Sequence, residues 1–230
     1  MAPTAPHAAA LAHLRAADER MAALISRAGP CRLILPDPET ARAVTMGPQP
    51  APNPGALARA QHHFEGLVSA IVSQQLSSRA AETILGRVRA LGLDESGALS
   101  PARLQALPEA ALRGAGLSGA KTRYVRDLCD RVTRSALPLD RLHELDDEGV
   151  IETLTAIKGV GRWTAEMVLI FRLGRPDVLP VDDLGIQKGF QKLFGLRKLP
   201  APERMTKLAR PFRPYRSVAC WYLWRLNEER

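Results

Sequence analysis

Apolar side chains recur at intervals of three and four residues over most of this chain, the spacing that places them on one face of a helix. Alternating runs of Val, Ile and Thr, which would indicate strands, are almost absent. The pattern therefore predicts a nearly all-α protein. The predicted helical segments are residues 11–29, 64–76, 77–92, 101–116, 121–136, 146–157, 165–171, 179–195, 201–212 and 216–230.

Glycine and proline mark where these helices stop. Gly29 and Pro30 end the first predicted helix, because neither residue continues a helix readily. The stretch from Leu35 to Gly55 contains GPQPAPNPG, so we expect an irregular connector there. Residues 1–7 are expected to form a disordered tail. After Phe64 the turns are short, and successive helices are expected to pack antiparallel.

The charge balance narrows the class of partner. The chain has 230 residues, a formal net charge of +8 and a pI of about 9.9, which suits a polyanion such as nucleic acid. Cys31, Cys129 and Cys220 are far apart in the sequence, so we expect free thiols. No apolar run approaches the ~20 residues of a membrane span, and MAPTAPHAAA lacks the features of a signal peptide. We therefore expect a cytoplasmic protein with no membrane partner.

The segment AIKGVGRWTA joins two predicted helices through only Lys158–Gly161. So short a turn needs backbone angles that glycine tolerates, and it exposes N–H groups at the positive end of the second helix. With no side chain on Gly159 or Gly161, a phosphate can approach this backbone closely, and Lys158 and Arg162 add positive charge. The segment predicts a cradle for a nucleic-acid backbone, although a packing hairpin whose glycines only cap the helices has the same spacing.

The hairpin sequence IKGVGRWTAEMVL is followed after a short interval by LPVDDLGIQKGF. In these two segments the chain resembles the helix-hairpin-helix DNA glycosylases, in particular the bacterial DNA-3-methyladenine glycosylase II branch, which repairs alkylated bases. The resemblance covers most of the chain, since it includes FEGLVSAIVSQQLSSRAA, GLSGAKTRYVRDL and RPYRSVACWYLWR. It implies an all-α, two-lobed fold with the active-site cleft between the lobes. The lobes would be a six-helix barrel, residues 64–177 with the hairpin at about 146–173, and a terminal bundle, residues 8–63 and 178–230.

The resemblance assigns the hairpin to DNA binding. The residues that it implies are Lys158, Gly159, Val160, Gly161, Arg162 and Thr164. The family also holds a structural Na⁺ or K⁺ on hairpin carbonyls, which by position are those of Thr155, Ile157 and Val160. No other cofactor is implied. The iron–sulfur branch of the family requires four closely spaced cysteines near the C-terminus, where this chain has only Cys220, so no cluster is expected.

The essential carboxylate of the family falls on the second acid of VDD, Asp183, with Asp182 as the alternative. Acids at the start of a helix are commonly capping residues. The same position keeps a carboxylate ionised, which is the form needed beside a deoxyribose that becomes positive as its base leaves. At ~4 Å and an effective dielectric constant near 20, such a charge contributes about 4 kcal/mol. Capping and catalysis are compatible at Asp183, whether it only stabilises this charge or also activates the attacking water.

At Trp163 this chain differs from part of the family. Members that also cut the DNA strand carry a lysine at this position, which attacks the sugar and forms a Schiff base. An indole cannot do so, and Lys158 lies on the turn itself, where we expect a phosphate contact. The resemblance therefore implies a monofunctional glycosylase that leaves an abasic site.

Aromatic side chains are expected to select the damaged base, because an alkylated purine is electron-poor and stacks well on an indole. Trp163 and Trp224 match positions that line the base pocket of the family. Tyr222 is a further candidate, and Met167 stands where some relatives have an aromatic residue. Trp221, Tyr222 and Trp224 cannot all face one pocket from a single helix, so at least one of them is expected in the core.

A base inside duplex DNA must be flipped out before its glycosidic bond is accessible, and the gap must be filled. The family inserts a side chain from the turn that SQQLS occupies in this chain. Gln75 is therefore the candidate wedge, with Leu76 and Gln74 as alternatives. An ordinary helix-terminal Gln fits the same position.

Together with the resemblance, these features predict a monofunctional DNA glycosylase that hydrolyses the N-glycosidic bond of alkylated bases. It is expected to act as a monomer on double-stranded DNA with a flipped base, in base excision repair, and to associate with the nucleoid through DNA. The alternative is a non-catalytic helix-hairpin-helix protein that binds DNA or senses damage, in which Asp183 only caps its helix. A third hypothesis, a glycosylase-lyase for oxidised bases, is disfavoured by Trp163.

Overall fold

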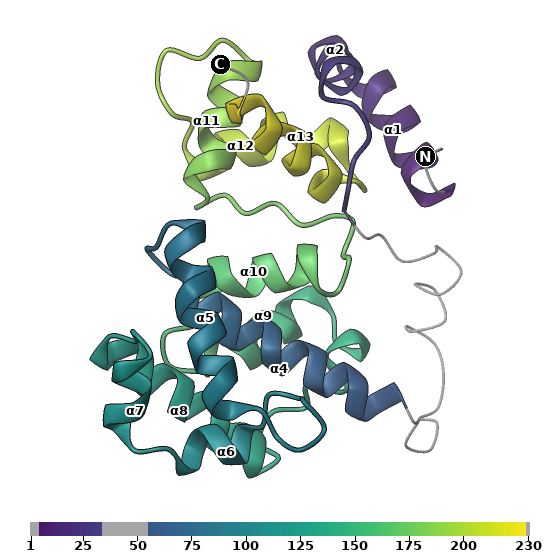
Figure 1. Ribbon diagram of the computed structural model, residues 1–230. Coiled ribbons are helices and arrows are strands. Elements are labelled where there is room, and N and C mark those ends of the chain that lie inside the picture. Colours follow the sequence, from purple (N-terminus) through teal and green to yellow (C-terminus); the bar gives the residue numbers. More distant parts are fainter. Residues whose placement is uncertain (1–4, 34–54, 229–230) are drawn as a thin grey trace. The chain divides into compact units, whose positions relative to one another are not determined.

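The computed structural model describes residues 5–33 and 55–228 (Figure 1). Its elements are helical, and the described residues contain no strand beyond one isolated bridge between Leu93 and Leu99. The all-α fold class is confirmed. The described residues fall into two compact units: unit 1 holds those within Met1–Gly47 and Leu169–Arg230, and unit 2 holds those within Pro48–Val168. The sequence predicted the boundaries between the two lobes at 63/64 and 177/178, and both observed boundaries lie earlier in the chain.

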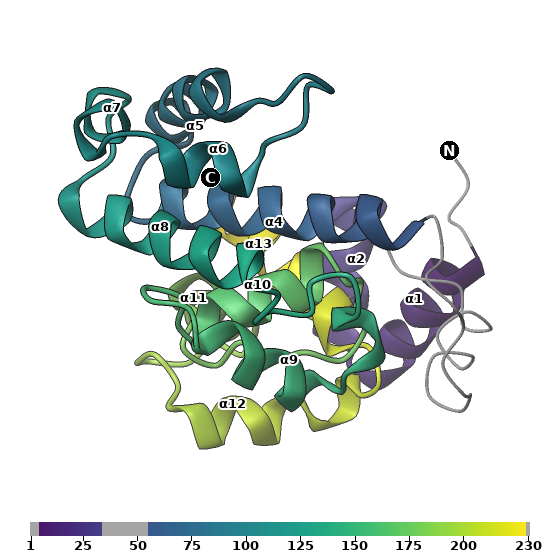
Figure 2. The same cartoon turned by 90° about the horizontal axis from the view of Figure 1, so that it is seen from below.

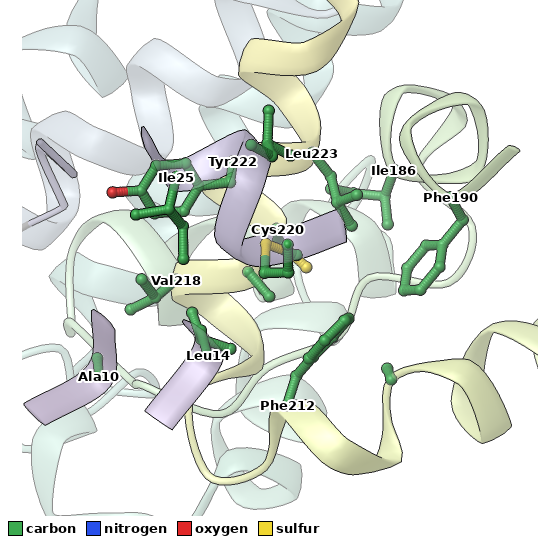
Figure 3. Packing of buried hydrophobic residues seen from close by; sticks show 14 of the residues in the cluster. Ala10, Leu14, Ile25, Ile186, Phe190, Phe212, Val218, Cys220, Tyr222 and Leu223 are labelled. Carbon is green, nitrogen blue, oxygen red and sulfur yellow. The ribbon is translucent and has the colours of Figure 1, made fainter. Parts of the chain in front are cut away.

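Unit 1 combines helices from opposite ends of the sequence. Its elements are α1 (Ala5–Ala17), α2 (Glu19–Ala28), α11 (Leu184–Leu193), α12 (Pro202–Leu208), the 3-10 turn η2 (Arg210–Phe212) and α13 (Arg216–Glu228). Buried side chains from these helices, among them Leu14, Ile25, Ile186 and Tyr222, form one apolar cluster (Figure 3). Removing this surface from water drives their association, so the N-terminal helices support the helix that carries Trp224.

The first predicted helix, residues 11–29, is wrong as a single element because Asp18 divides it. The backbone of Asp18 is extended, with φ −159°, and its Oδ1 accepts the N–H groups of Arg20 at 2.9 Å and Met21 at 3.3 Å. These bonds satisfy donors that begin a new helix. The predicted tail is also corrected, because α1 already begins at Ala5. Gly29 ends α2 with φ +77°, as expected.

Unit 2 is built from α4 (Gly55–Ser73), α5 (Ser78–Gly92), α6 (Pro101–Ala106), α7 (Glu109–Gly114), α8 (Gly119–Thr133), the 3-10 turn η1 (Leu142–Glu144) and α9 (Asp147–Thr155). Helix α8 packs against α4 and α6 (Figures 1 and 2). Helix α10 (Arg162–Phe171) begins in unit 2 and its last residues belong to unit 1.

Two predicted boundaries in unit 2 need correction. Helix α4 begins at Gly55 rather than at Phe64, so it takes up residues that the sequence assigned to the terminal bundle. The rest of the predicted connector lies outside the described residues. The predicted helix 101–116 is divided into α6 and α7 at Leu107 and Pro108, because proline lacks the N–H that a continuous helix requires.

Side-chain caps fix the starts of α5, α8 and α9. Ser77, Ser118 and Asp146 each accept a backbone N–H from the first turn of α5, α8 and α9, respectively. Such caps replace missing intrahelical partners and set where each helix begins. Among the described helices, none is long and apolar enough to cross a bilayer.

Candidate functional site

The hairpin between α9 and α10 is a tight turn over 156–161. The side chains of Ile157 and Val160 are buried, and the N–H of Val160 donates to the carbonyl of Ile157 at 3.1 Å. Gly159 has φ +79°, and a Cβ at this position would lie 2.1 Å from the ring of Tyr124. Both the backbone angle and the packing against α8 therefore require glycine at Gly159.

Gly161 has a different environment from Gly159. A Cβ on Gly161 would meet no atom within 4 Å, and its φ lies outside the left-handed region. The fold by itself does not demand glycine here. The missing side chain instead leaves open space beside the backbone that starts α10, where an anion can approach the N–H groups.

The two cations of the hairpin are already engaged by acids that the sequence analysis missed. Arg162 donates to Glu148 through Nη2 at 2.6 Å and Nη1 at 3.1 Å, and through Nε to Glu166 at 3.3 Å. The N–H of Lys158 donates to Asp127 Oδ2 at 3.0 Å, and its ammonium lies 3.7 Å from Oδ1. The acids could not be assigned as partners from sequence, because Asp127 lies 31 residues and Glu148 14 residues from the cations.

These contacts have electrostatic consequences. Burial by itself raises the pKa of Asp127, but the Lys158 N–H and the Arg131 guanidinium outweigh it, and the net pKa lies below the usual value. The hydrogen bonds from Arg162 hold the pKa of Glu148 below its usual value. Both carboxylates are therefore charged at neutral pH. In the absence of DNA, the positive charge of Arg162 is neutralised by its carboxylate partners. Its role as a phosphate contact stays a prediction.

A hollow of about 710 Å³ lies beside the hairpin within unit 2. It unites predicted residues from separate parts of the sequence: the hairpin glycines, two base-pocket candidates and the wedge turn. Trp163 is 44% exposed there, whereas Thr164 is buried. The lining residues that were predicted are Gln74, Gln75, Leu76, Gly159, Gly161, Trp163, Thr164 and Met167, and those that were not are Ala70 and Ser73.

The turn between α4 and α5 presents Gln75 in an unusual conformation. Gln75 is exposed and has φ +57°, which is uncommon for a residue with a side chain. Gln74 Nε2 donates to the carbonyl of Gly159 at 2.9 Å, so this alternative wedge is committed to the hairpin. Lys121 Nζ donates to the carbonyls of Val72 at 2.7 Å and Gln74 at 2.6 Å. The turn is thus tied both to α8 and to the hairpin.

Asp183 is the N-cap of α11 in unit 1 and is only 9% exposed. Its Oδ1 accepts the backbone N–H of Ile186 at 2.7 Å and the indole Nε1–H of Trp224 at 2.9 Å. Asp182, the alternative, is exposed. Two donors on one oxygen hold the carboxylate in place, and the bond from Ile186 confirms the predicted cap at Asp183.

The residues that support this acid were not predicted from the sequence. A Cβ on Gly185 would lie 2.9 Å from Cδ1 of Trp224 and 3.0 Å from Oδ1 of Asp183, so only glycine lets the two meet. Asn227 Nδ2 donates to the carbonyl of Gly185 at 2.7 Å, and Gln187 Nε2 donates to the carbonyl of Val181 at 3.0 Å. The only sequence signal for these supporting residues is the glycine that follows the acid pair in DDLG, Gly185.

Trp224 and Tyr222 of α13 take different roles. Trp224 stacks on Phe171, with ring centroids 5.6 Å apart and an interplanar angle of 27°. Tyr222 is fully buried in the core of unit 1, where its hydroxyl donates to the carbonyl of Gly29 at 2.9 Å. Burial raises the pKa of Tyr222 to about 12. Its assignment to the base pocket is therefore corrected: Tyr222 is the core aromatic that the crowding on this helix required.

The cysteines are free thiols, as predicted. Cys129 and Cys220 are buried and Cys31 is partly buried. Burial raises the pKa of Cys129 to about 12 and that of Cys31 to about 11, so these two thiols are protonated at neutral pH.

Comparison with known proteins places this arrangement in a family. Residues 68–214 match the model of the HhH-GPD superfamily base excision DNA repair protein. The alkylbase DNA glycosidase-like protein mag2 of Schizosaccharomyces pombe is 31% identical over 93% of this chain and 91% of its own length. The solved structure of S. pombe 3-methyladenine DNA glycosylase Mag1 in complex with abasic DNA is 31% identical, covers 95% of this chain and 96% of its own, and superposes with a TM-score of 0.75. The DNA-3-methyladenine glycosidase of Bacillus halodurans is 37% identical, covers 96% of this chain and 91% of its own, and superposes with a TM-score of 0.73.

Proposed function

Because the chain belongs to the HhH-GPD superfamily of base excision DNA repair proteins, we propose that it is a DNA glycosylase for alkylated bases of the 3-methyladenine type. The observation that carries this proposal is the geometry of Asp183. A nearly buried carboxylate at a helix N-terminus, with one oxygen held by Ile186 and Trp224, is suited to act as a fixed negative charge.

Asp183 would act on the sugar rather than on the base. As the N-glycosidic bond lengthens, the deoxyribose gains oxocarbenium character, and the ionised carboxylate stabilises this charge. A stabilisation of about 4 kcal/mol corresponds to roughly a thousandfold in rate. Water then takes the place of the base, and the same carboxylate orients or deprotonates it. The donors on Oδ1 hold the acid in place without supplying a proton, because both are neutral N–H groups.

The hairpin would hold the DNA backbone. Open space at Gly161 and the N-terminal N–H groups of α10 support a phosphate contact there. A monovalent cation on the carbonyls of Thr155, Ile157 and Val160 is also proposed, because neutral carbonyl oxygens suit such an ion. The buried side chains of Ile157 and Val160 anchor two of these residues. The ion would only stiffen the turn.

The hollow in unit 2 would receive DNA opened by base flipping. The exposed indole of Trp163 and the thioether of Met167 offer an electron-rich surface for an electron-poor base. Gln75, exposed at the tip of its turn, would fill the gap in the stack. Because Trp163 stands where lyases of the family carry lysine, the enzyme would leave an abasic site without cutting the strand.

Release of methylated bases from alkylated duplex DNA, followed by chromatography, tests this function. Asp183→Asn should lose about a thousandfold in base release while keeping its affinity for DNA. Asp182→Asn, which removes the neighbouring exposed charge, is the matched control and should remain active. A protein that binds DNA but releases no base in any variant would instead be a non-catalytic DNA-binding protein. Trapping of a covalent adduct by borohydride would contradict the monofunctional assignment.

A further inference from the structure

The loop after α11 forms a second hollow, of about 630 Å³, within unit 1. Its lining includes Arg197, Lys198 and Arg204, all exposed, and Leu199, which is 43% exposed. No acidic side chain is among the lining residues. Glu203, the nearest acid in the sequence, is exposed and lies outside the lining. Three positive charges therefore surround one concave surface.

These cations differ from the buried or half-buried arginines elsewhere in the chain. Arg216 is only 15% exposed. It donates through Nε to Asp177 Oδ1 at 2.7 Å and through Nη2 to Asp177 Oδ2 at 2.9 Å. Arg162 is likewise held by two carboxylates. Within the described residues, Arg197, Lys198 and Arg204 make no ion pair. Unneutralised cations that share a hollow favour an anionic ligand.

We propose that this hollow binds a backbone phosphate of duplex DNA, as a contact separate from the hairpin. This proposal rests on the proposed function only because it takes DNA as the ligand. Long exposed cations suit a phosphodiester backbone, because such contacts position the protein without reading bases. A phosphorylated small molecule shares this chemistry, and the experiment separates the two sources.

The test measures affinity for undamaged duplex DNA as a function of salt. The full-length variant R197A/K198A/R204A is compared with R89A/R134A/R141A, which removes the same amount of charge from arginines that are paired on the surface. Each phosphate contact contributes about 0.9 to the slope of log affinity against log salt. The first variant should lose about 0.9 of this slope, whereas the control should keep it.

Equal slopes in the two variants would overturn the proposal, because net charge alone would then explain the binding. Competition by inorganic phosphate or a mononucleotide at matched ionic strength would also overturn it, since the hollow would then serve a small ligand. Failure of the glycosylase function is distinguishable, because it appears as absent base release and leaves the salt slope unchanged.

An independent observation concerns Lys121, which lies on α8 and reaches the carboxyl end of α4. Its ammonium donates to the carbonyl of Val72, in the last turn of α4, and to that of Gln74, which directly follows the helix. Carbonyls at the end of a helix have no intrahelical partner. Desolvation lowers the pKa of Lys121, so this ammonium has given up water for the carbonyls. Within the described residues it makes no ion pair with an acid.

We infer that Lys121 is a positioning residue for Gln75 rather than a contact to DNA. Its two bonds hold the turn on one side, and the bond from Gln74 to Gly159 holds it on the other. Gln75 is thereby kept in its left-handed conformation at the rim of the hollow. The inference rests on the proposed role of Gln75 as the wedge.

A fluorescent 2-aminopurine beside the lesion reports unstacking when a wedge enters the duplex. Lys121→Met should reduce this signal and base release several-fold while the salt slope stays unchanged. Gln75→Ala should give a similar loss, and the double variant should lose no more than either, because both act through one turn. A slope that falls by about 0.9 with an intact signal would identify a phosphate contact and overturn the inference. Asp183→Asn separates this inference from the proposed function, since it should lose about a thousandfold in base release and keep the 2-aminopurine signal.

Discussion

The indole N–H of Trp224 and the backbone N–H of Ile186 converge on the same oxygen of Asp183. The two donors come from different helices, so the carboxylate is fixed by the packing of α13 against α11 as well as by its own helix. This relationship makes Trp224 more than a stacking surface. Its substitution is expected to disturb the acid directly.

Trp224→Phe keeps an aromatic ring against Phe171 but removes the donor to Asp183. A hydrogen bond to a charged group contributes about 1.5–3 kcal/mol, so base release should fall by about tenfold to a hundredfold. The loss should appear in kcat more than in KM, because the donor acts on the catalytic group. Trp221→Phe on the same helix is the control. Equal activity of the two variants would contradict a role for the indole N–H.

Gly185→Ala should reduce activity, because the added Cβ meets both Trp224 and Asp183 at about 3 Å. The residues must separate, which breaks the bond between them. Gly86→Ala is the matched control: it lies in α5, and its Cβ would meet nothing within 4 Å. There alanine should stabilise the helix by up to about 1 kcal/mol. Thermal unfolding and base release, measured on both variants, check the contrast.

Glu148→Gln should release Arg162 from its strongest partner and raise affinity for DNA. If the freed guanidinium gains one phosphate, the salt slope increases by about 0.9. Glu152→Gln, an exposed acid on the same helix, makes the same charge change without touching Arg162 and is the control. The pKa of Glu148 is lowered, so in the wild type the pair persists as pH falls through the ordinary glutamate range and is lost only below it. Tighter binding in mildly acidic buffer at constant salt would contradict this order of titration.

Asp127→Ala should destabilise unit 2 at neutral pH by about 1–3 kcal/mol, because the Lys158 N–H and Arg131 lose a charged acceptor. The folded pKa of Asp127 is depressed, so its contribution is complete above the unfolded value and is lost as pH falls through the folded one. The difference from wild type in urea unfolding should therefore shrink below about pH 4. Asp130→Ala, which removes an exposed ion pair on the same helix, should change stability by less than about 1 kcal/mol.

The helical fold was predictable because apolar spacing is a local property of the sequence. The break at Asp18 was missed because apolar residues continue at helical spacing on both sides of it. Only the bonds from Arg20 and Met21 reveal that Asp18 starts a new helix. The split at Pro108 was readable from the sequence, since proline disfavours the helical conformation in the residue before it.

The acid was predictable as a cap and its supporting residues were not. An acid pair at the start of a predicted helix indicates that Asp183 caps it. The need for glycine at Gly185 becomes apparent only in the structure, where Trp224 packs beside it. Tyr222 could have been separated from Trp224 by geometry alone. At 3.6 residues per turn, side chains two positions apart lie on nearly opposite faces of a helix. One of them had to enter the core.

The bond from the Tyr222 hydroxyl to the carbonyl of Gly29 has a consequence for biosynthesis. The segments it joins are separated by most of the polypeptide, and both contribute to one apolar cluster. During translation, α1 and α2 must wait for α13 to leave the ribosome before that cluster can close. A prematurely terminated chain that ends before α13 would lack the donor to Asp183, so the acid reaches its working geometry only after α13 has been synthesised.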